Sequence, residues 1–154
     1  MRRIVVAVAA LLTMAGVAAP AHAALGEPLS SVQSEQAKTR ASRSSVAAAS
    51  GASVQELRLA DGSSIRQYVN AQGIVFAVAW STRIKPDFGQ WLGHHAATFD
   101  AAVADAARQP GLKRSAMVDQ GDLVVQSFGR PGAFNGKAWL KSQLPSSWQT
   151  DAIR

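Results

Sequence analysis

Hydrophobic and polar positions alternate along residues 54–69 and then give way to an apolar run. In residues 54–59 the leucines fall on one face of an extended chain and the charged residues on the other, and residues 65–69 alternate similarly. Such alternation is typical of half-buried strands. The run "IVFAVAW" at residues 74–80 is apolar on both faces, which predicts a central strand covered on one side by a helix. The Asp-Gly pair at 61–62 predicts the turn between the first two strands.

After Pro86 the apolar residues recur at spacings of three and four, which predicts one long helix ending at residues 109–111. Its apolar stripe would pack on the sheet and comprises Phe88, Trp91, Leu92, His95, Phe99, Ala102, Val103 and Ala106. Gly89 and Gly93 lower the intrinsic helix propensity by about 1 kcal/mol each. They indicate either a close approach to the sheet or a kink.

Further strands are expected after the helix. Residues 112–118 and 123–129 have the pattern of a second hairpin around "DQGD". For residues 133–141 we favour one strand with a bulge at Gly136 over two short strands joined by a turn there. The predicted fold class is α+β: an antiparallel β-sheet made of a three-stranded meander, one long helix and then two or three further strands, with the helix packed on one face.

The N-terminal residues have the organisation of a secretory signal peptide. Arg2 and Arg3 precede the uncharged apolar residues 4–19, and the small residues of "AHA-A" predict cleavage between Ala23 and Ala24. A membrane anchor is the other interpretation, but residues 4–19 are shorter than the roughly 20 residues that a spanning helix needs. We therefore expect residues 1–23 to be removed and the protein to be periplasmic or secreted, with no stable membrane span afterwards.

The residues that follow divide into an arm, a domain and a tail. Residues 24–53 are expected to form a flexible N-terminal arm, because the segment 30–53 is rich in Ser and Ala and has few bulky apolar side chains. A helix docked on the domain is the alternative for 30–53, and the "ALGEP" that opens the arm is either a short docked strand or a partner-binding end. The α+β domain spans residues 54–144. The C-terminal tail, residues 145–154, has no periodicity.

Composition narrows the function classes. The chain has 154 residues, which corresponds to one domain once a signal peptide is removed. Lys and Arg number 16 and Asp and Glu 10, and loss of Arg2 and Arg3 would lower the net charge from +6 to +4. These charges are scattered, whereas nucleic-acid-binding proteins concentrate Lys and Arg on one face, so no nucleic-acid partner is expected. The absence of cysteine excludes disulfides and thiolate zinc sites.

Three stretches of the chain are shared with a known family. They are "ALGEP" directly after the predicted signal peptide, "RQYVNAQGIVFAVAW" followed by a Pro-Asp pair and "QWLG", and "DLVVQSFGRPGAFNGKAWL" before "DAIR". In these stretches the sequence resembles the bacterial family catalogued as domain of unknown function 2844. The resemblance implies a small exported protein of a Gram-negative bacterium and implies no reaction, cofactor or catalytic residue.

Few residues offer catalytic or metal-binding chemistry. His95 is a weak candidate for a catalytic base, and its place in the apolar stripe favours a partly buried core histidine instead. On a helix, His94 would point about 100° away from it, so the pair is not expected to chelate one ion, and no metal or cofactor is predicted. Asp119 and Asp122 flank a glycine, which is more typical of a hairpin turn than of a calcium loop.

The tryptophans are better candidates for ligand binding. Trp80 ends the central strand and Trp91 lies near the start of the predicted helix, so the two are expected to meet at one end of the sheet. Trp148 lies in the tail, where packing explains it least. Aromatic side chains at the mouth of a sheet–helix layer bind sugars, peptides or lipid tails, although such residues are more often part of the core.

These observations lead to one function hypothesis with two alternatives. We expect a non-catalytic periplasmic module that binds an unknown envelope component or a protein partner through Trp80, Trp91, Trp148 or the flexible arm. One alternative is an enzyme that acts on an envelope polymer with His95 as general base. The other is a structural subunit that is secreted or lies at the cell surface.

Overall fold

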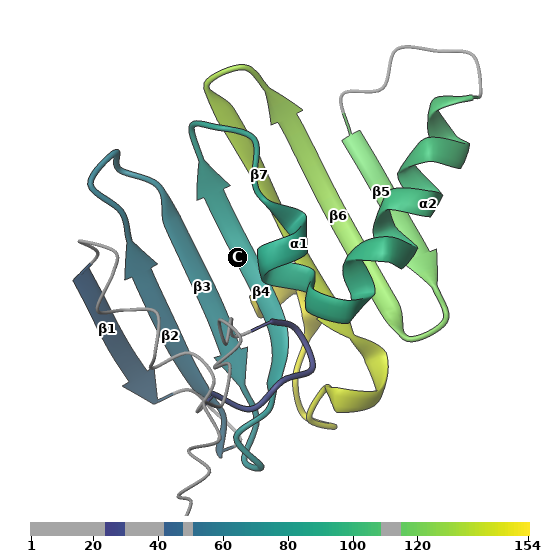
Figure 1. Ribbon diagram of the computed structural model, residues 1–154. Coiled ribbons are helices and arrows are strands. Elements are labelled where there is room, and N and C mark those ends of the chain that lie inside the picture. Colours follow the sequence, from purple (N-terminus) through teal and green to yellow (C-terminus); the bar gives the residue numbers. More distant parts are fainter. Residues whose placement is uncertain (1–23, 30–41, 48–50, 109–114) are drawn as a thin grey trace, which may run out of the picture.

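The computed structural model describes residues 24–29, 42–47, 51–108 and 115–154. The predicted signal peptide and the predicted helix end at residues 109–111 lie outside the described residues. The strands form one seven-stranded antiparallel sheet in the order β1-β2-β3-β4-β7-β6-β5 (Figure 1). Their bounds are β1 (Ser42–Ala47), β2 (Ser53–Arg58), β3 (Ser64–Val69), β4 (Val75–Thr82), β5 (Ser115–Gln120), β6 (Leu123–Arg130) and β7 (Ala133–Leu140).

The helices lie over one face of this sheet, which we call the helix face; the opposite face is the tail face (Figure 1). The helical part consists of α1 (Phe88–Leu92), the 3₁₀ turn η3 (Gly93–His95) and α2 (Ala96–Ala107), and the 3₁₀ turns η4 (Lys141–Gln143) and η5 (Thr150–Ala152) follow β7. The predicted α+β fold, an antiparallel sheet with the helical part on one face, is confirmed. Each helix within the described ranges is too short or too polar to cross a membrane.

Short polar side chains close the turns of the N-terminal meander. The Asp61 carboxylate accepts hydrogen bonds from the Ser63 main-chain N–H (2.8 Å) and hydroxyl (2.9 Å), and Gly62 has a φ of 84°. The hydrogen bond from the Ser63 main chain, followed by that from its hydroxyl, lowers the pKa of Asp61. At the next turn, the Asn70 side chain accepts from the Ile74 main-chain N–H (3.0 Å). The turn predicted at 61–62 is therefore present.

The run at residues 74–80 forms the buried central strand that its sequence predicts. Within β4, Ser81 is the one exposed residue. The register with β3 shifts between Tyr68 and Val69, and Phe76 is the extra residue on β4. This bulge places Phe76 in the apolar cluster on the tail face, while Val75 remains in the cluster under the helices.

The predicted long helix is interrupted at Gly93. Asp87 caps α1 by accepting from the Gln90 main-chain N–H (3.4 Å), and Gly93, with a φ of 53°, separates α1 from η3 and α2. A Cβ at Gly93 would lie 2.4 Å from the Cβ of Ala24. This glycine therefore marks a kink, and the close approach there is to the N-terminal residues.

Gly136 forms no bulge, so that prediction is wrong. Residues of β7 pair in continuous register with β4 and β6 on either side of it. A Cβ at Gly136 would lie 2.4 Å from the main-chain oxygen of Gln126 and 2.5 Å from Cζ2 of Trp80. The glycine is present because the indole ring of Trp80 lies directly against the β7 backbone.

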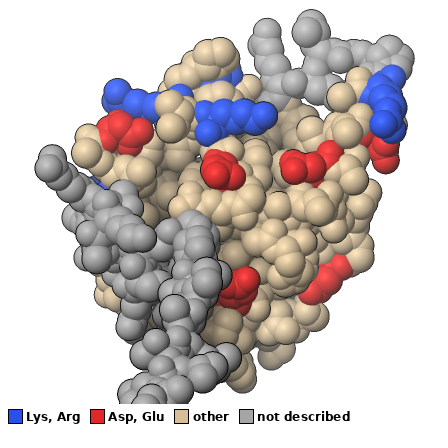
Figure 2. Space-filling model, in the orientation of Figure 1, with Lys and Arg blue, Asp and Glu red and all other residues tan. Residues whose placement is uncertain are grey.

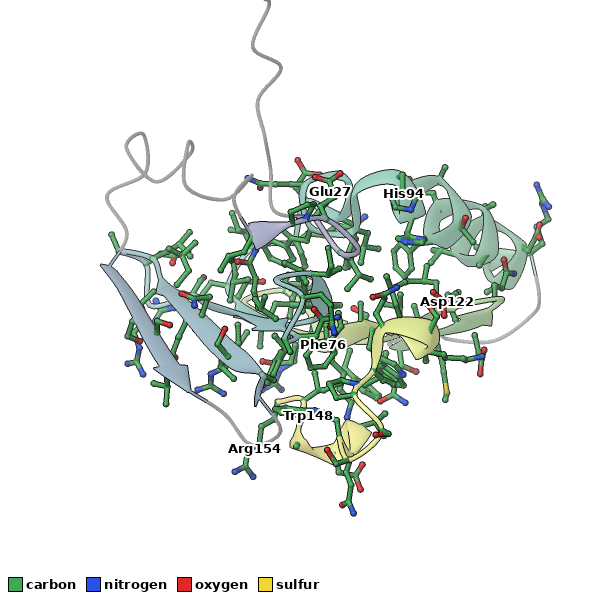
Figure 3. The ribbon with its side chains drawn as sticks, turned by 90° about the horizontal axis from the view of Figure 1, so that it is seen from below. Glu27, Phe76, His94, Asp122, Trp148 and Arg154 are labelled. Carbon is green, nitrogen blue, oxygen red and sulfur yellow. The ribbon has the colours of Figure 1, made fainter. Side chains whose placement is uncertain are left out.

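The C-terminal tail packs across part of the tail face, opposite the helices (Figure 3). Ile153 is 1% exposed, and the Trp148 ring meets Phe76 edge-on with a centroid distance of 5.4 Å. The Tyr68 hydroxyl donates to the main-chain oxygen of Arg154 (2.9 Å) and accepts from its N–H (3.1 Å). Residues without any sequence periodicity thus complete the second half of the core.

Part of the predicted flexible arm is a strand, so the prediction is wrong for residues 42–47. They pair with β2 along their whole length, and the Gln55 side chain donates to the Ser45 hydroxyl (2.7 Å). Val46 is 63% exposed, which shows how little apolar burial this edge strand needs. Main-chain hydrogen bonds to β2 hold this strand in place, and amino-acid composition cannot predict such bonds.

At the beginning of the arm, the docked interpretation of "ALGEP" is the one that the structure shows. Ala24 and Leu25 are buried, at 2% and 0% exposure. Pro28 forms an isolated antiparallel bridge with Ile74. These residues therefore belong to the same folded unit as the sheet.

Candidate functional site

Two of the three candidate tryptophans meet, and they meet inside the core. The ring centroids of Trp80 and Trp91 are 5.9 Å apart, as their positions in the sequence predict. Phe88 extends this cluster, at 5.4 Å from Trp80 and 4.6 Å from Phe99. Because Trp80 is only 4% exposed, the cluster chiefly fixes α1 on the sheet.

Trp148 lies on the tail face, away from the other two candidates (Figure 3). Its ring packs edge-on against Tyr68 at a centroid distance of 5.9 Å. The buried indole N–H groups of Trp148 and Trp80 have no hydrogen-bond partner among the described residues. The three tryptophans therefore do not form one site.

The two histidines stack on each other, which the sequence did not predict. Their ring centroids are 3.9 Å apart, because Gly93–His95 form a 3₁₀ turn and not the regular helix on which the rings would diverge. Burial lowers the pKa of His95, the neighbouring charge of His94 lowers it further, and Asp122 acts in the opposite direction. His95 is thus a partly buried histidine whose neutral form is favoured.

No metal-binding cluster surrounds His95 in the part of the chain that the structure describes. Both oxygens of Asp122 are taken by Ser142, through its main-chain N–H and its hydroxyl, each at 2.7 Å. Asp122 therefore anchors η4. The described residues contain no group of three or more His, Cys, Asp or Glu that could hold a metal ion.

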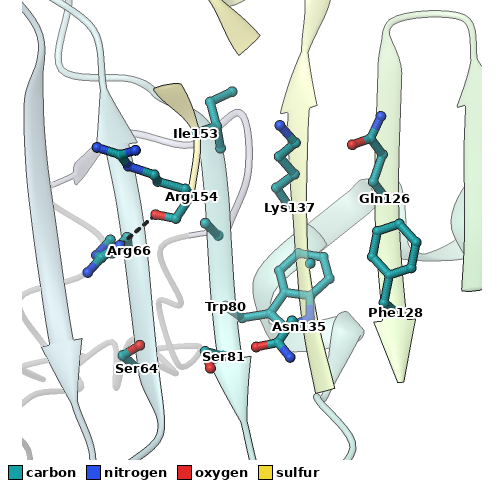
Figure 4. A pocket seen from close by; sticks show the side chains of 12 residues that line it. Ser64, Arg66, Trp80, Ser81, Gln126, Phe128, Asn135, Lys137, Ile153 and Arg154 are labelled. Carbon is teal, nitrogen blue, oxygen red and sulfur yellow. Dashed lines mark hydrogen bonds between the residues drawn. The ribbon is translucent and has the colours of Figure 1, made fainter. Parts of the chain in front are cut away.

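A recess of about 330 Å³ lies in the tail face beside the end of the tail (Figure 4). Four adjacent strands and the last two residues of the chain line it: Ser64, Arg66, Ala79, Trp80, Ser81, Gln126, Phe128, Asn135, Gly136, Lys137, Ile153 and Arg154. The small residues Ala79 of β4 and Gly136 of β7 belong to this lining, and the indole ring of Trp80 packs against Gly136 from the helix side. Of the candidate residues from the sequence, only Trp80 takes part in it.

The recess is cationic. Arg66, Lys137 and Arg154 line it, and none of the other described residues in its lining is Asp or Glu. Arg66 donates to the main-chain oxygen of Arg154 (2.7 Å) and to Glu56 (3.3 Å), and Glu56 also pairs with Arg58 (3.2 Å). One carboxylate, that of Glu56, is therefore shared between the guanidinium groups of Arg58 and Arg66.

Lys137 is held in place without a carboxylate. Its Nζ donates to the main-chain oxygen of Thr150 (2.9 Å) and lies 5.6 Å from the ring centroid of Trp139. Within the described residues it forms no ion pair. The helix face differs from the recess in its charges: Figure 2 shows basic and acidic side chains interspersed along the upper edge of that face.

An apolar surface borders the recess. Phe128 is 59% exposed on β6, and Met117, opposite Gln126 on β5, is 73% exposed. Because side chains alternate along a strand, Gln126 and Phe128 share the tail face, and Met117 lies on that face as well. The site thus combines cations, amide and hydroxyl groups, and an aromatic ring open to solvent.

These features define a small α+β protein with a ligand-sized recess, whose described lining residues include three cations and no His, Asp or Glu. Its sequence matches the family described as "Protein of unknown function (DUF2844)" over residues 21–153, and the chain belongs to that family. Comparisons with curated proteins and with solved structures gave no match.

Proposed function

We propose that the protein is an exported, non-catalytic binding module and that its recess binds an acidic saccharide of the cell envelope. The observation that carries this proposal is the lining of the recess, which includes Arg66, Lys137 and Arg154 and, among the described residues, no Asp or Glu side chain. Cations already held by neighbouring groups lose little freedom when an anion arrives. They therefore favour a carboxylate or phosphate ligand.

A saccharide fits the rest of the lining. Ser64, Ser81, Gln126 and Asn135 offer hydroxyl and amide groups, and Phe128, at 59% exposure, offers a ring on which the apolar face of a sugar stacks. The volume of about 330 Å³ falls within the range of about 300–1,000 Å³ that is usual for small-molecule sites. A neutral polymer would offer no anionic group to the three cations of the recess.

A binding role is favoured over catalysis because the described residues that line the recess include no His, Cys, Asp or Glu, the side chains that most often serve as general acids and bases or as activated nucleophiles. His95 belongs to the helix side of the sheet, with Gly26 and Leu140 nearby, and does not line the recess. Export is supported by the arginines, apolar stretch and "AHA-A" sequence at the N-terminus. N-terminal sequencing of protein recovered from periplasm and culture medium tests export directly.

The binding test uses trigalacturonate as an acidic probe and maltotriose as its neutral counterpart. Binding is followed by tryptophan fluorescence, since Trp80 lines the recess. We expect trigalacturonate to bind and maltotriose to bind far more weakly. Lys137→Gln should weaken trigalacturonate binding about tenfold, the value of a charged hydrogen bond. Phe128→Ala should also weaken it without loss of stability, because this ring is exposed.

Lys85→Gln is the matched control, because Lys85 is exposed and does not line the recess. Equal binding of both trisaccharides, or equal losses in Lys137→Gln and Lys85→Gln, would contradict the proposed site. Binding of dodecanoate in place of trigalacturonate would also contradict the saccharide and would indicate a lipid ligand.

A further inference from the structure

Residues 24–29, which we call the N-terminal segment, are built into the core beside α1. Leu25 is 0% exposed and belongs to the apolar cluster of the helix face. Its main-chain N–H donates to the Trp91 oxygen at the end of α1 (2.9 Å), and the Gly26 N–H donates to the Val75 oxygen of β4 (2.8 Å). The segment thus joins the helix to the central strand.

Two glycines make room for this segment. Gly93 has a φ of 53°, and a Cβ there would lie 2.4 Å from the Cβ of Ala24. Gly26 has a φ of 88°, and a Cβ there would meet Leu140 at 3.2 Å and His94 at 3.5 Å. Gly93 therefore leaves no room for a side chain of its own beside Ala24.

The N-terminal segment begins at Ala24, the residue that signal cleavage would make the new N-terminus. The predicted cut falls between Ala23 and Ala24, and the family match starts only at residue 21, which leaves the basic and apolar leader outside it. A protease needs a locally unfolded substrate, and Ala24, at 2% exposure, is accessible only when the segment is undocked. Cleavage therefore precedes docking.

We propose that cleavage after Ala23 creates an N-terminus that the domain itself binds, with the Glu27 carboxylate as partner of the new ammonium group at Ala24. The Glu27 N–H donates to the Ala24 oxygen (3.0 Å), which turns the chain back on itself. The Ala24 Cβ and Glu27 Oε1 lie 2.4 Å and 3.7 Å from the position that a Cβ of Gly93 would occupy. Both groups therefore border the same small space.

The charge balance favours this pairing. Among the described residues, no Lys or Arg forms an ion pair with Glu27. An ammonium group brought into a largely buried place needs a partner, because burial without one is strongly unfavourable. The inference rests on the proposed export, and the protease step and the docking step are tested separately below.

The docking step is tested with a chain that begins at Ala24, released from a cleavable fusion, and with the same chain acetylated at its N-terminus. Each is combined with Glu27→Gln, and urea unfolding midpoints are compared at pH 7. We expect Glu27→Gln to lower the midpoint of the free-amine chain and to leave that of the acetylated chain nearly unchanged. The difference should disappear above about pH 9, where the α-amino group is neutral.

Asp100→Asn is the matched control, since Asp100 is exposed on α2 and should shift both chains equally. If Glu27→Gln shifts the free and the acetylated chain by the same amount, the ion pair is refuted. Amide exchange gives a second measurement: the N–H groups of Leu25 and Gly26 should be protected in the Ala24 chain. If these N–H groups exchange without protection in the unsubstituted Ala24 chain, the docking of the N-terminal segment is refuted.

N-terminal sequencing separates this inference from the proposed function. Export with a first residue other than Ala24 would overturn the inference and leave export standing. Absence of saccharide binding would refute the recess proposal and leave the Ala24–Glu27 pair unaffected.

Discussion

Replacing Gly136 by alanine tests the packing at the centre of the sheet. The new methyl group would lie 2.4 Å from the main-chain oxygen of Gln126 and 2.5 Å from Cζ2 of Trp80. Carbon atoms normally approach to about 3.5–4.0 Å. Both neighbours are fixed, because one is the backbone of an adjacent strand and the other is a 4% exposed indole packed under α1.

The expected cost follows from these two contacts. Overpacking a core typically costs about 1–3 kcal/mol, and we expect the upper end, because relief requires a strand or the indole ring to move. A Gly-to-Ala change also restricts the unfolded chain, which returns about 0.4–1 kcal/mol of stability. The net destabilisation should therefore be about 2–3 kcal/mol, a large part of the total stability of a domain of this size.

The assay is urea unfolding, followed by tryptophan fluorescence and far-UV circular dichroism. With a urea dependence of about 1–3 kcal/mol per molar, the midpoint for Gly136→Ala should fall by about 1 M or more. Gly129→Ala is the matched control on β6: the three atoms nearest to its Cβ would all belong to the Phe134 ring, the first two at 2.6 and 2.9 Å, and this half-buried side chain can turn aside. Equal midpoints for the two variants would refute the reasoning.

Three further outcomes are expected. Because burial lowers the pKa of His95, the unfolded state binds more protons than the folded state, so stability should fall as the pH drops below about 6.5. In His95→Gln the thermal unfolding midpoint should therefore depend less on pH between pH 7 and 5, and an unchanged pH dependence would contradict this. Ile153→Ala should cost about 2–5 kcal/mol in urea unfolding, whereas a negligible loss would show that the tail does not belong to the core. Asn70→Ala should cost about 1–3 kcal/mol, since it removes the side-chain oxygen that accepts from the Gln72 and Ile74 main-chain N–H groups and each such bond contributes about 0.5–1.5 kcal/mol, and an unchanged midpoint would count against that role.

Periodicity predicted the elements whose neighbours in space are also neighbours in sequence. The strand at 74–80 and the hairpins around it follow from alternation and turn residues, because a half-buried strand needs opposite polarity on its two faces. The helix start near Pro86 follows from the Asp87 cap and the change of period. The kink at Gly93 remained one of two interpretations, since the contact that requires it, with Ala24, is distant in sequence.

The sequence pattern did not predict the edge strand β1 or the packing of the tail, because both are held by contacts with other segments of the chain and not by a local pattern. Residues 42–47 carry almost no apolar signal, and pairing with β2 is what holds them. Trp148 and Ile153 have no period because each fills a separate gap over the sheet. At Gly136, the sequence correctly indicated a special backbone position but not its cause, which is the ring of Trp80 on the adjacent strand.

The recess could be predicted only in part, because it depends on where the tail stops. Every second residue of a strand faces the same side of the sheet. On the tail face, β3 therefore changes from Tyr68 to Arg66, and β7 changes from Trp139 to Lys137. Alternation alone reveals this change from aromatic to cationic side chains within each strand. It does not show that β4 lies between the two strands, which aligns the changes at one level of the sheet. The tail covers the aromatic half of this face, so the same face is part of the core at one end and carries the recess at the other.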